Sequence, residues 1–139
     1  MFHHIVVPVD FTARNKQALD LAVNLAIMSQ ARVTLLHVIE LMQNAVFEDF
    51  ADFYATLATE ADTKLQALVA PYAETTITID QRVIYGDRVR EILRLIQDEK
   101  VDLLVMSSHQ IDPTDPARGW GSISHKIGIL APCPVLLMK

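Results

Sequence analysis

Residue types that could bind a nucleotide follow several apolar runs of this sequence. Asp10 comes directly after the run 5–9, Ser107 follows the run 101–106, and Gly121-Ser122 precedes residues with helical spacing. A carboxylate can accept hydrogen bonds from two sugar hydroxyls at once. A helix start with free N–H groups, a hydroxyl and little side-chain bulk favours an anion such as phosphate. These residue types predict a nucleotide-shaped site if the fold brings them together.

Five short apolar runs, rich in β-branched residues, are typical of strands that are buried on both faces of a sheet. The expected strands are residues 5–9, 32–38, 76–84, 101–106 and 135–138. Between them, apolar residues recur at helical spacing. The expected helices run from an N-cap at Thr12 to Ser29, from Phe47 to Pro71, from an N-cap at Asp87 through Ile96, and from Gly121-Ser122 to Pro132.

The alternation of strand and helix predicts an α/β fold, in which a parallel five-stranded sheet carries helices on both faces. The length of 139 residues suits one domain. In an open sheet of this kind, ligands bind outside the carboxyl ends of the strands, which is where Asp10 and Ser107 would lie. The alternative is that Asp10 and Thr12 only turn and cap the chain, and that Gly121-Ser122 only starts a helix.

Composition excludes several classes of protein. The chain is 51% apolar and 21% charged, which excludes a disordered chain, and its one cysteine cannot form an internal disulfide. The formal charge of -5 disfavours binding to duplex nucleic acid. No apolar run approaches the roughly 18 residues that span a bilayer, and the N-terminus lacks the basic region of a signal peptide. We therefore expect a soluble cytoplasmic protein that binds neither membrane nor nucleic acid.

Metal binding and catalysis are not expected either. The five histidines have no partner four residues away, and the lone cysteine offers no zinc-binding pair. The chain lacks both the phosphate-binding Gly-x-x-x-x-Gly-Lys-Ser/Thr motif and the Gly-x-Ser-x-Gly nucleophile elbow. We predict a protein that is not an enzyme, with a slow nucleotide hydrolase as the weaker alternative.

Five segments in order resemble the universal stress protein family along nearly the whole chain. They are residues 5–12, 35–38, 86–87, 101–106 and 131–137. The resemblance implies a Rossmann-like, adenine nucleotide alpha hydrolase-like sandwich with strand order 3-2-1-4-5. It also implies a homodimer that pairs through the last strand, since an apolar edge strand needs a cover. A further protein partner is expected, but the sequence does not identify it.

The resemblance implies binding of ATP or another adenine nucleotide. Mg²⁺ is expected only together with a bound nucleotide. The residues carried over, together with Arg118, which we add because its guanidinium could hold a phosphate, are Pro8, Val9, Asp10, Val38, Met106, Ser107, His109, Arg118, Gly121, Ser122 and Ile123. In this reading Asp10 binds the ribose and the backbone of Val38 binds the adenine. The phosphates are bound by Ser107, His109 and Gly121-Ser122.

The phosphate loop departs from the pattern of ATP-binding members, which is Gly, two residues, Gly, nine residues, then Gly with Ser or Thr. Ser107 and Gln110 stand at the first two glycine positions, and ten residues separate Gln110 from Gly121. Pro113 and Pro116 also remove two N–H donors. An alternative function is therefore a dimeric interaction module of the same fold that has lost nucleotide binding.

An aromatic cluster comprises Phe47, Phe50, Phe53 and Tyr54. We expect these rings in the core, with part of a partner surface as the alternative.

Overall fold

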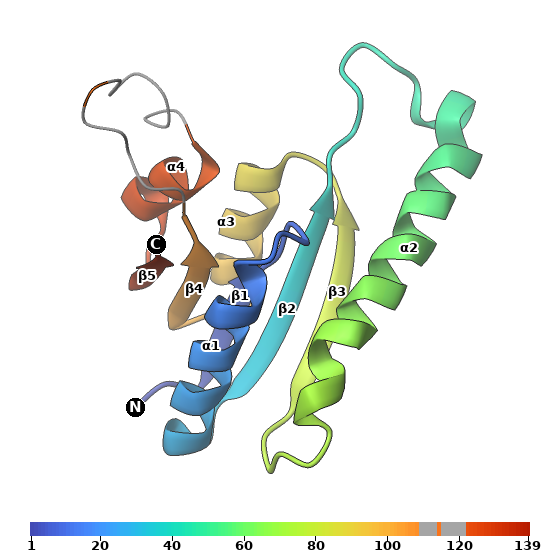
Figure 1. The fold of residues 1–139 in the computed structure, drawn as a ribbon. Helices are drawn as coiled ribbons and strands as arrows, with labels where there is room; N and C mark the ends of the chain where they lie inside the picture. Colours follow the sequence, from blue (N-terminus) through green and yellow to red (C-terminus); the bar gives the residue numbers. More distant parts are fainter. Residues whose placement is uncertain (109–113, 115–121) are drawn as a thin grey trace.

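The computed structural model of the chain describes residues 1–108, 114 and 122–139, and its elements alternate between strand and helix. The strands are β1 (His4–Pro8), β2 (Arg32–Ile39), β3 (Ile79–Tyr85), β4 (Leu103–Ser107) and β5 (Val135–Met138). The helices are α1 (Asn15–Ser29), α2 (Ala51–Val69), α3 (Arg88–Asp98) and α4 (Ile123–Leu130). Two short 3-10 turns, η1 (Phe47–Phe50) and η2 (Ala70–Tyr72), flank α2. Figure 1 labels the strands and the α-helices.

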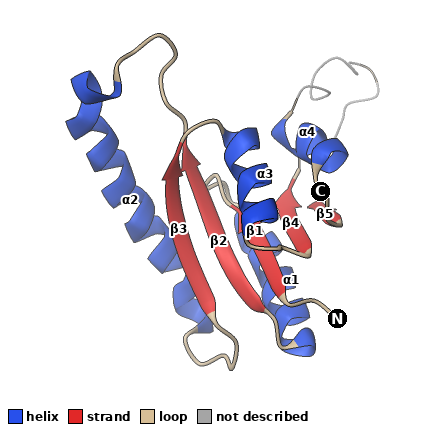
Figure 2. Cartoon of the chain, turned by 180° about the vertical axis from the view of Figure 1, so that it is seen from behind, coloured by secondary structure: helices blue, strands red, loops and turns tan. Residues whose placement is uncertain are grey.

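All strand pairs are parallel, and the order across the sheet is β3-β2-β1-β4-β5 (Figure 2). This confirms the α/β fold and the strand order implied by the family resemblance. Strand β1 lies between β2 and β4, so the connections that leave these three strands start from neighbouring points. Such a place, where the chain departs to different sides of the sheet, is where open α/β folds form their ligand crevice.

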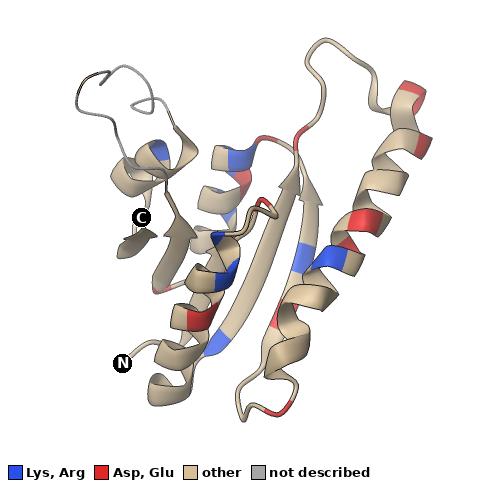
Figure 3. Cartoon of the chain, viewed as in Figure 1, with Lys and Arg blue, Asp and Glu red and all other residues tan. Residues whose placement is uncertain are grey.

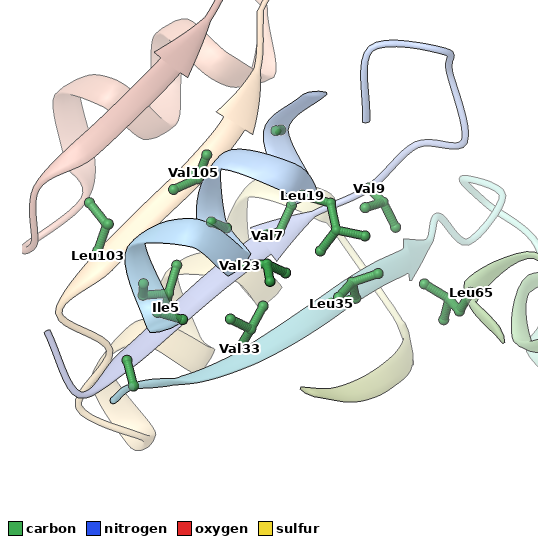
Figure 4. Close-up of a cluster of buried hydrophobic side chains, with 14 residues drawn as sticks. Ile5, Val7, Val9, Leu19, Val23, Val33, Leu35, Leu65, Leu103 and Val105 are labelled. Atoms are coloured by element: carbon green, nitrogen blue, oxygen red, sulfur yellow. The ribbon is translucent and has the colours of Figure 1, made fainter. Parts of the chain in front are cut away.

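Both faces of the sheet are buried, because its central strands are apolar at successive positions. Ile5 and Val7 of β1 pack beneath α1 and α2, in a cluster that also contains Leu35 and Leu65 (Figure 4). Val6, which points to the other face, packs beneath α3 and α4. The helices therefore form an outer layer on each side and hold the carboxyl ends of the strands in fixed positions.

Two boundary predictions are wrong. Thr12 is not the N-cap of α1, because this helix begins at Asn15 after Arg14. The hydroxyl of Thr12 instead donates to Oδ1 of Asp10 over 2.8 Å, within the turn that leaves β1. Strand β3 begins at Ile79, later than expected.

The aromatic cluster is only partly buried. Tyr54 lies in the core, whereas Phe47, Phe50 and Phe53 are exposed, so placing all four in the core was wrong. The reason is geometric, since α2 continues past the tips of β2 and β3 and its first turns have no sheet beneath them (Figure 1).

A series of side-chain hydrogen bonds joins β1, β2 and β3 near the amino ends of these strands, opposite the ligand crevice expected at the carboxyl ends. His4 is 3% exposed, and its Nδ1 accepts a hydrogen bond from Arg32 over 3.2 Å. Its Nε2 donates to Thr34 Oγ1 over 2.7 Å, and that hydroxyl donates to Asp80 Oδ1 over 2.5 Å. Because one ring nitrogen must accept, His4 is neutral. Burial is the largest cause that lowers the pKa of His4 below the ordinary value of 6.5, and the positive charge of Arg32 is the second.

We expect the free energy of unfolding to fall as the pH drops below about 6.5. A histidine whose pKa is lower in the folded state binds fewer protons there than in the unfolded chain, so acid favours unfolding. His37 acts in the same direction, because burial lowers its pKa as well. Urea unfolding at about pH 8 and about pH 5.5 measures the effect, and His4→Gln should reduce the difference. Equal stability at the two pH values would contradict this expectation.

Among the described residues, no three His, Cys, Asp or Glu side chains are grouped so that they could hold a metal ion. Within the same ranges, no helix is long and apolar enough to cross a membrane.

Candidate functional site

A hollow opens at the carboxyl ends of β1, β2 and β4, where α3 and α4 begin. It encloses about 440 Å³ when the open solvent at its mouth is included. It is lined by Pro8, Val9, Asp10, Asn15, Leu36, Val38, Arg88, Ile92, Met106, Ser107 and Ile123.

The structure brings together most of the residues that the sequence selects. Those that line the hollow are Pro8, Val9, Asp10, Val38, Met106, Ser107 and Ile123. Ser122 does not line it, but its hydroxyl caps the adjacent helix α4 by accepting from the backbone N–H of His125 over 3.2 Å. His109, Arg118 and Gly121 lie outside the described residues.

Asp10 is an exposed carboxylate at the mouth of the hollow. Its Oδ1 accepts from the backbone N–H of Thr12 over 3.1 Å and from the Thr12 hydroxyl. Burial raises the pKa of Asp10, but hydrogen bonds from Thr12 and Asn15 outweigh this and hold it below its ordinary value. Asp10 is therefore ionised throughout the neutral range and can accept hydrogen bonds from a ligand's hydroxyl groups.

Asn15 is the residue that fixes this arrangement, and the sequence analysis missed it. Its side chain is 1% exposed, and Oδ1 accepts from the backbone N–H groups of both Asp10 and Phe11, over 3.0 and 2.7 Å. Its Nδ2 lies 3.4 Å from Ser107 Oγ. Asn15 thus joins the loop after β1 to the end of β4. An amide one helical turn before the buried stripe of Ala18 and Leu19 was the signal that could have revealed it.

The loop after β1 is held in a single shape by further contacts. Phe11 has φ of 65°, in the left-handed region that residues with a side chain rarely adopt. Its ring packs 4.4 Å from that of His37, whose Nδ1 donates to the carbonyl of Val9 over 2.9 Å. The position of Asp10 is therefore set by the residues on both sides of it.

The wall of the hollow is suited to a flat apolar group. Val38, Met106 and Ile92 are almost fully buried and present aliphatic surface from two strands and α3. Arg88, at the first turn of α3, also lines the hollow, and its Nε lies 3.8 Å from Glu40 Oε1. Sequence reasoning did not select Arg88, although its place directly after the capping residue Asp87 puts it at this edge of the sheet.

Hydroxyl groups gather beside the hollow at the start of α4. Ser108 Oγ lies 3.1 Å from Ser124 Oγ, which lies 3.2 Å from Ser122 Oγ. Arg14 donates to the carbonyl of Ser108 over 2.8 Å. A carboxylate, an apolar wall and a group of hydroxyls therefore lie together at this edge of the sheet.

Fold and site define the class of protein as a doubly wound α/β domain with a ligand crevice beside its first and fourth strands. The Universal stress protein family model matches residues 1–139, and the chain belongs to this family. Universal stress protein YxiE of Bacillus subtilis (strain 168) is 29% identical over 149 residues that cover both chains completely. The hypothetical protein MJ0577 superposes with a TM-score of 0.84 at 25% identity, covering 100% of this chain and 96% of the other.

Two further structures of the same fold contain nucleotides. A universal stress protein from Archaeoglobus fulgidus in complex with dAMP has a TM-score of 0.72 and 18% identity, and covers 99% of this chain and 98% of its own. A universal stress protein in complex with cAMP has a TM-score of 0.67 and 20% identity, with coverage of 99% and 97%. These similarities show the shared fold.

Proposed function

We propose that this universal stress protein binds an adenine nucleotide in the hollow beside Asp10 and acts through occupancy rather than turnover. The observation that carries the proposal is the union of an ionised carboxylate with a buried aliphatic wall at the carboxyl ends of β1 and β4. Two proteins of this fold were solved with dAMP and cAMP, which supports the same ligand class here.

Each part of a nucleotide has a suitable counterpart among the lining residues. Val38, Met106 and Ile92 would cover the base on apolar surface, with backbone groups near Val38 turned to its polar edge. Asp10 would accept from the ribose hydroxyls. Ser107 and the start of α4 would face the phosphates, and Mg²⁺ would enter with them. Among the described residues, no lysine lines the hollow to reach the β- and γ-phosphates, so we do not expect efficient hydrolysis.

Calorimetric titration with ATP, ADP and AMP tests the proposal, and saturable binding of at least one is expected. Native mass spectrometry of freshly purified protein adds a second reading, because a bound nucleotide would appear as an added mass. Failure of all three ligands at about millimolar concentration would refute it.

A dimeric interaction module without a nucleotide is the second candidate. Ser107 and Gln110 at the expected glycine positions favour it, since side chains there keep backbone N–H groups away from phosphates. A chain that carries no nucleotide after purification, and binds none, would support this reading.

We further propose a homodimer through β5, the edge strand next to β4. The carbonyls of Pro134 and Met138 bond to β4, so the alternation of a strand turns the backbone of Val135 and Leu137 outward. Such an edge can pair with its own copy.

Leu137→Pro removes an outward N–H without removing a bond to β4. Leu137→Lys places a charge on the same strand, at a partly buried side chain that packs against the core. Sedimentation velocity should show that both variants are monomeric or insoluble. A thermal unfolding curve serves as the control for folding. A folded variant that remains dimeric would contradict pairing through β5.

A further inference from the structure

A second surface, which shares no residue with the lining of the hollow, lies along the connection from β2 to α2 and the first turns of that helix. Every residue from 40 to 53 is exposed. The exposed apolar members, with Tyr85 at the end of β3, form what we call the aromatic face: Leu41, Met42, Val46, Phe47, Phe50, Phe53 and Tyr85. Phe53 is the most exposed of its rings, at 51%, and a group of neighbouring exposed apolar side chains is typical of an interaction site.

The aromatic face is built around one buried residue, to which several of its members are joined by contacts and hydrogen bonds. Tyr54 is 1% exposed, and its hydroxyl accepts from the backbone N–H of Met42 over 2.7 Å. Phe47 stacks on the Tyr54 ring at 5.3 Å between centroids, and Phe53 meets it edge-on at 5.5 Å. The Tyr85 hydroxyl donates to the carbonyl of Tyr54 over 3.2 Å. Rigid aromatic side chains of this kind are the usual anchors of protein interfaces.

The charged residues within the segment 40–53, which carries most of the aromatic face, are all acidic. The sequence contains no Lys or Arg from residue 33 to residue 63. Figure 3 accordingly shows acidic residues and no basic ones on the upper part of α2. Glu40 pairs with Arg88 at one margin. Within the described part of the chain, Glu48, Asp49 and Asp52 have no basic side chain within 4.0 Å.

This charge selects among the possible occupants. A second copy joined through this face about a two-fold axis would place acidic surface against acidic surface, which costs energy. An anionic bilayer surface and a nucleic acid would both be repelled. A cationic protein segment with apolar side chains along one side would satisfy both features, because its lysines and arginines meet the carboxylates while its apolar side chains cover the rings.

We propose that the aromatic face is a docking surface for a cationic amphipathic segment of a partner protein. Its rings supply the apolar anchors, and the three acidic residues at the start of α2 select the partner by charge. The surface is separate from the lining of the hollow, so the proposal does not depend on nucleotide binding.

The test uses the full chain and a fluorescent peptide of about 18 residues, in which leucine and lysine are placed at helical spacing. Saturable binding is expected, with a dissociation constant on the order of micromolar, followed by fluorescence anisotropy. Phe47→Ser with Phe53→Ser should weaken it by roughly tenfold or more. The control pair Ile27→Ser with Ile129→Ser changes exposed apolar residues elsewhere, 45% and 69% exposed, and should leave binding unchanged.

Charge variants separate a specific surface from general attraction to a negatively charged protein. Glu48→Lys with Asp52→Lys should weaken binding, whereas Glu74→Lys with Asp98→Lys, at exposed positions elsewhere, makes the same change in net charge and should not. Equal loss in both pairs would overturn the proposal. So would equal binding of a peptide with glutamate in place of lysine, absence of binding, binding of the face to anionic vesicles, or loss of a dimer in the phenylalanine variant.

Discussion

Asp10→Ala is expected to weaken the binding of adenine nucleotides by roughly 10- to 100-fold, the usual cost of losing a hydrogen bond to a charged group. The carboxylate lies at the mouth of the hollow, and its low pKa keeps it ionised at neutral pH. Without this acceptor in the protein, the hydroxyl groups of the ligand can donate their hydrogen bonds only to water. Isothermal titration calorimetry of the variant against wild type measures the change.

The control for this experiment must separate the ligand contact from the turn that Asp10 also holds. Asp10→Asn keeps a side-chain oxygen that can accept from Thr12 but removes the charge. Thr12→Val removes the hydroxyl that donates to Asp10 while leaving the carboxylate in place. We expect Asp10→Asn to bind weakly and Thr12→Val to bind nearly as wild type. Weaker binding in Thr12→Val than in Asp10→Asn would show that the turn matters more than the charge.

Asn15→Leu is expected to lower the free energy of unfolding by about 2–4 kcal/mol, because two backbone N–H groups lose their acceptor. The side chain is buried, and its Oδ1 accepts from both Asp10 and Phe11. Leucine has the same branching and the same number of heavy atoms, so the substitution leaves no cavity and the effect reports chiefly the lost hydrogen bonds. Urea unfolding measures it, and the loop that presents Asp10 should loosen at the same time.

Two substitutions serve as controls for Asn15→Leu. Asn24→Leu makes the same chemical change at an exposed position of α1 and should alter stability by no more than about 0.5 kcal/mol. Ser107→Ala removes only the longer contact to Asn15 Nδ2, so its effect should be small. If Asn15→Leu were as stable as Asn24→Leu, Asn15 would not hold the loop together.

The sequence was sufficient for the fold class, because the strands are continuous apolar runs and the helices have clear periodicity. The strand order could not be predicted from the residues alone, because nothing in the pattern of residues 5–9 indicates which strands flank them. That order came from the family resemblance, and the structure confirms it.

For the site, sequence reasoning selected residues mainly by their place at or after the ends of strands. Of the residues that line the hollow from helices, it selected Ile123 but missed Asn15, Arg88 and Ile92. Asp10, Val38 and Met106 line the hollow as expected, but Asn15 and Arg88 were not selected. Asn15 approaches from α1 and Arg88 from α3, so their part in the site depends on how these helices pack against the sheet. Helix packing is a tertiary property that periodicity alone does not reveal.

The aromatic cluster was misjudged for a related reason. Four residues have the spacing of a single helical stripe: Phe50, Phe53, Tyr54 and Leu57. An apolar stripe of this kind normally faces the core. Whether sheet lies beneath a given turn depends on where the neighbouring strands end. Here β2 ends at Ile39 and β3 ends at Tyr85. The first turns of α2 extend in space beyond the ends of both strands (Figure 1).

A crystal structure of the protein grown with ATP tests the central claim most directly, because it shows what lies beside Asp10. We predict density for the base between Val38 and Met106, with the ribose hydroxyls within hydrogen-bonding distance of the Asp10 carboxylate. A hollow filled by the protein's own side chains, or a nucleotide bound elsewhere, would contradict the account.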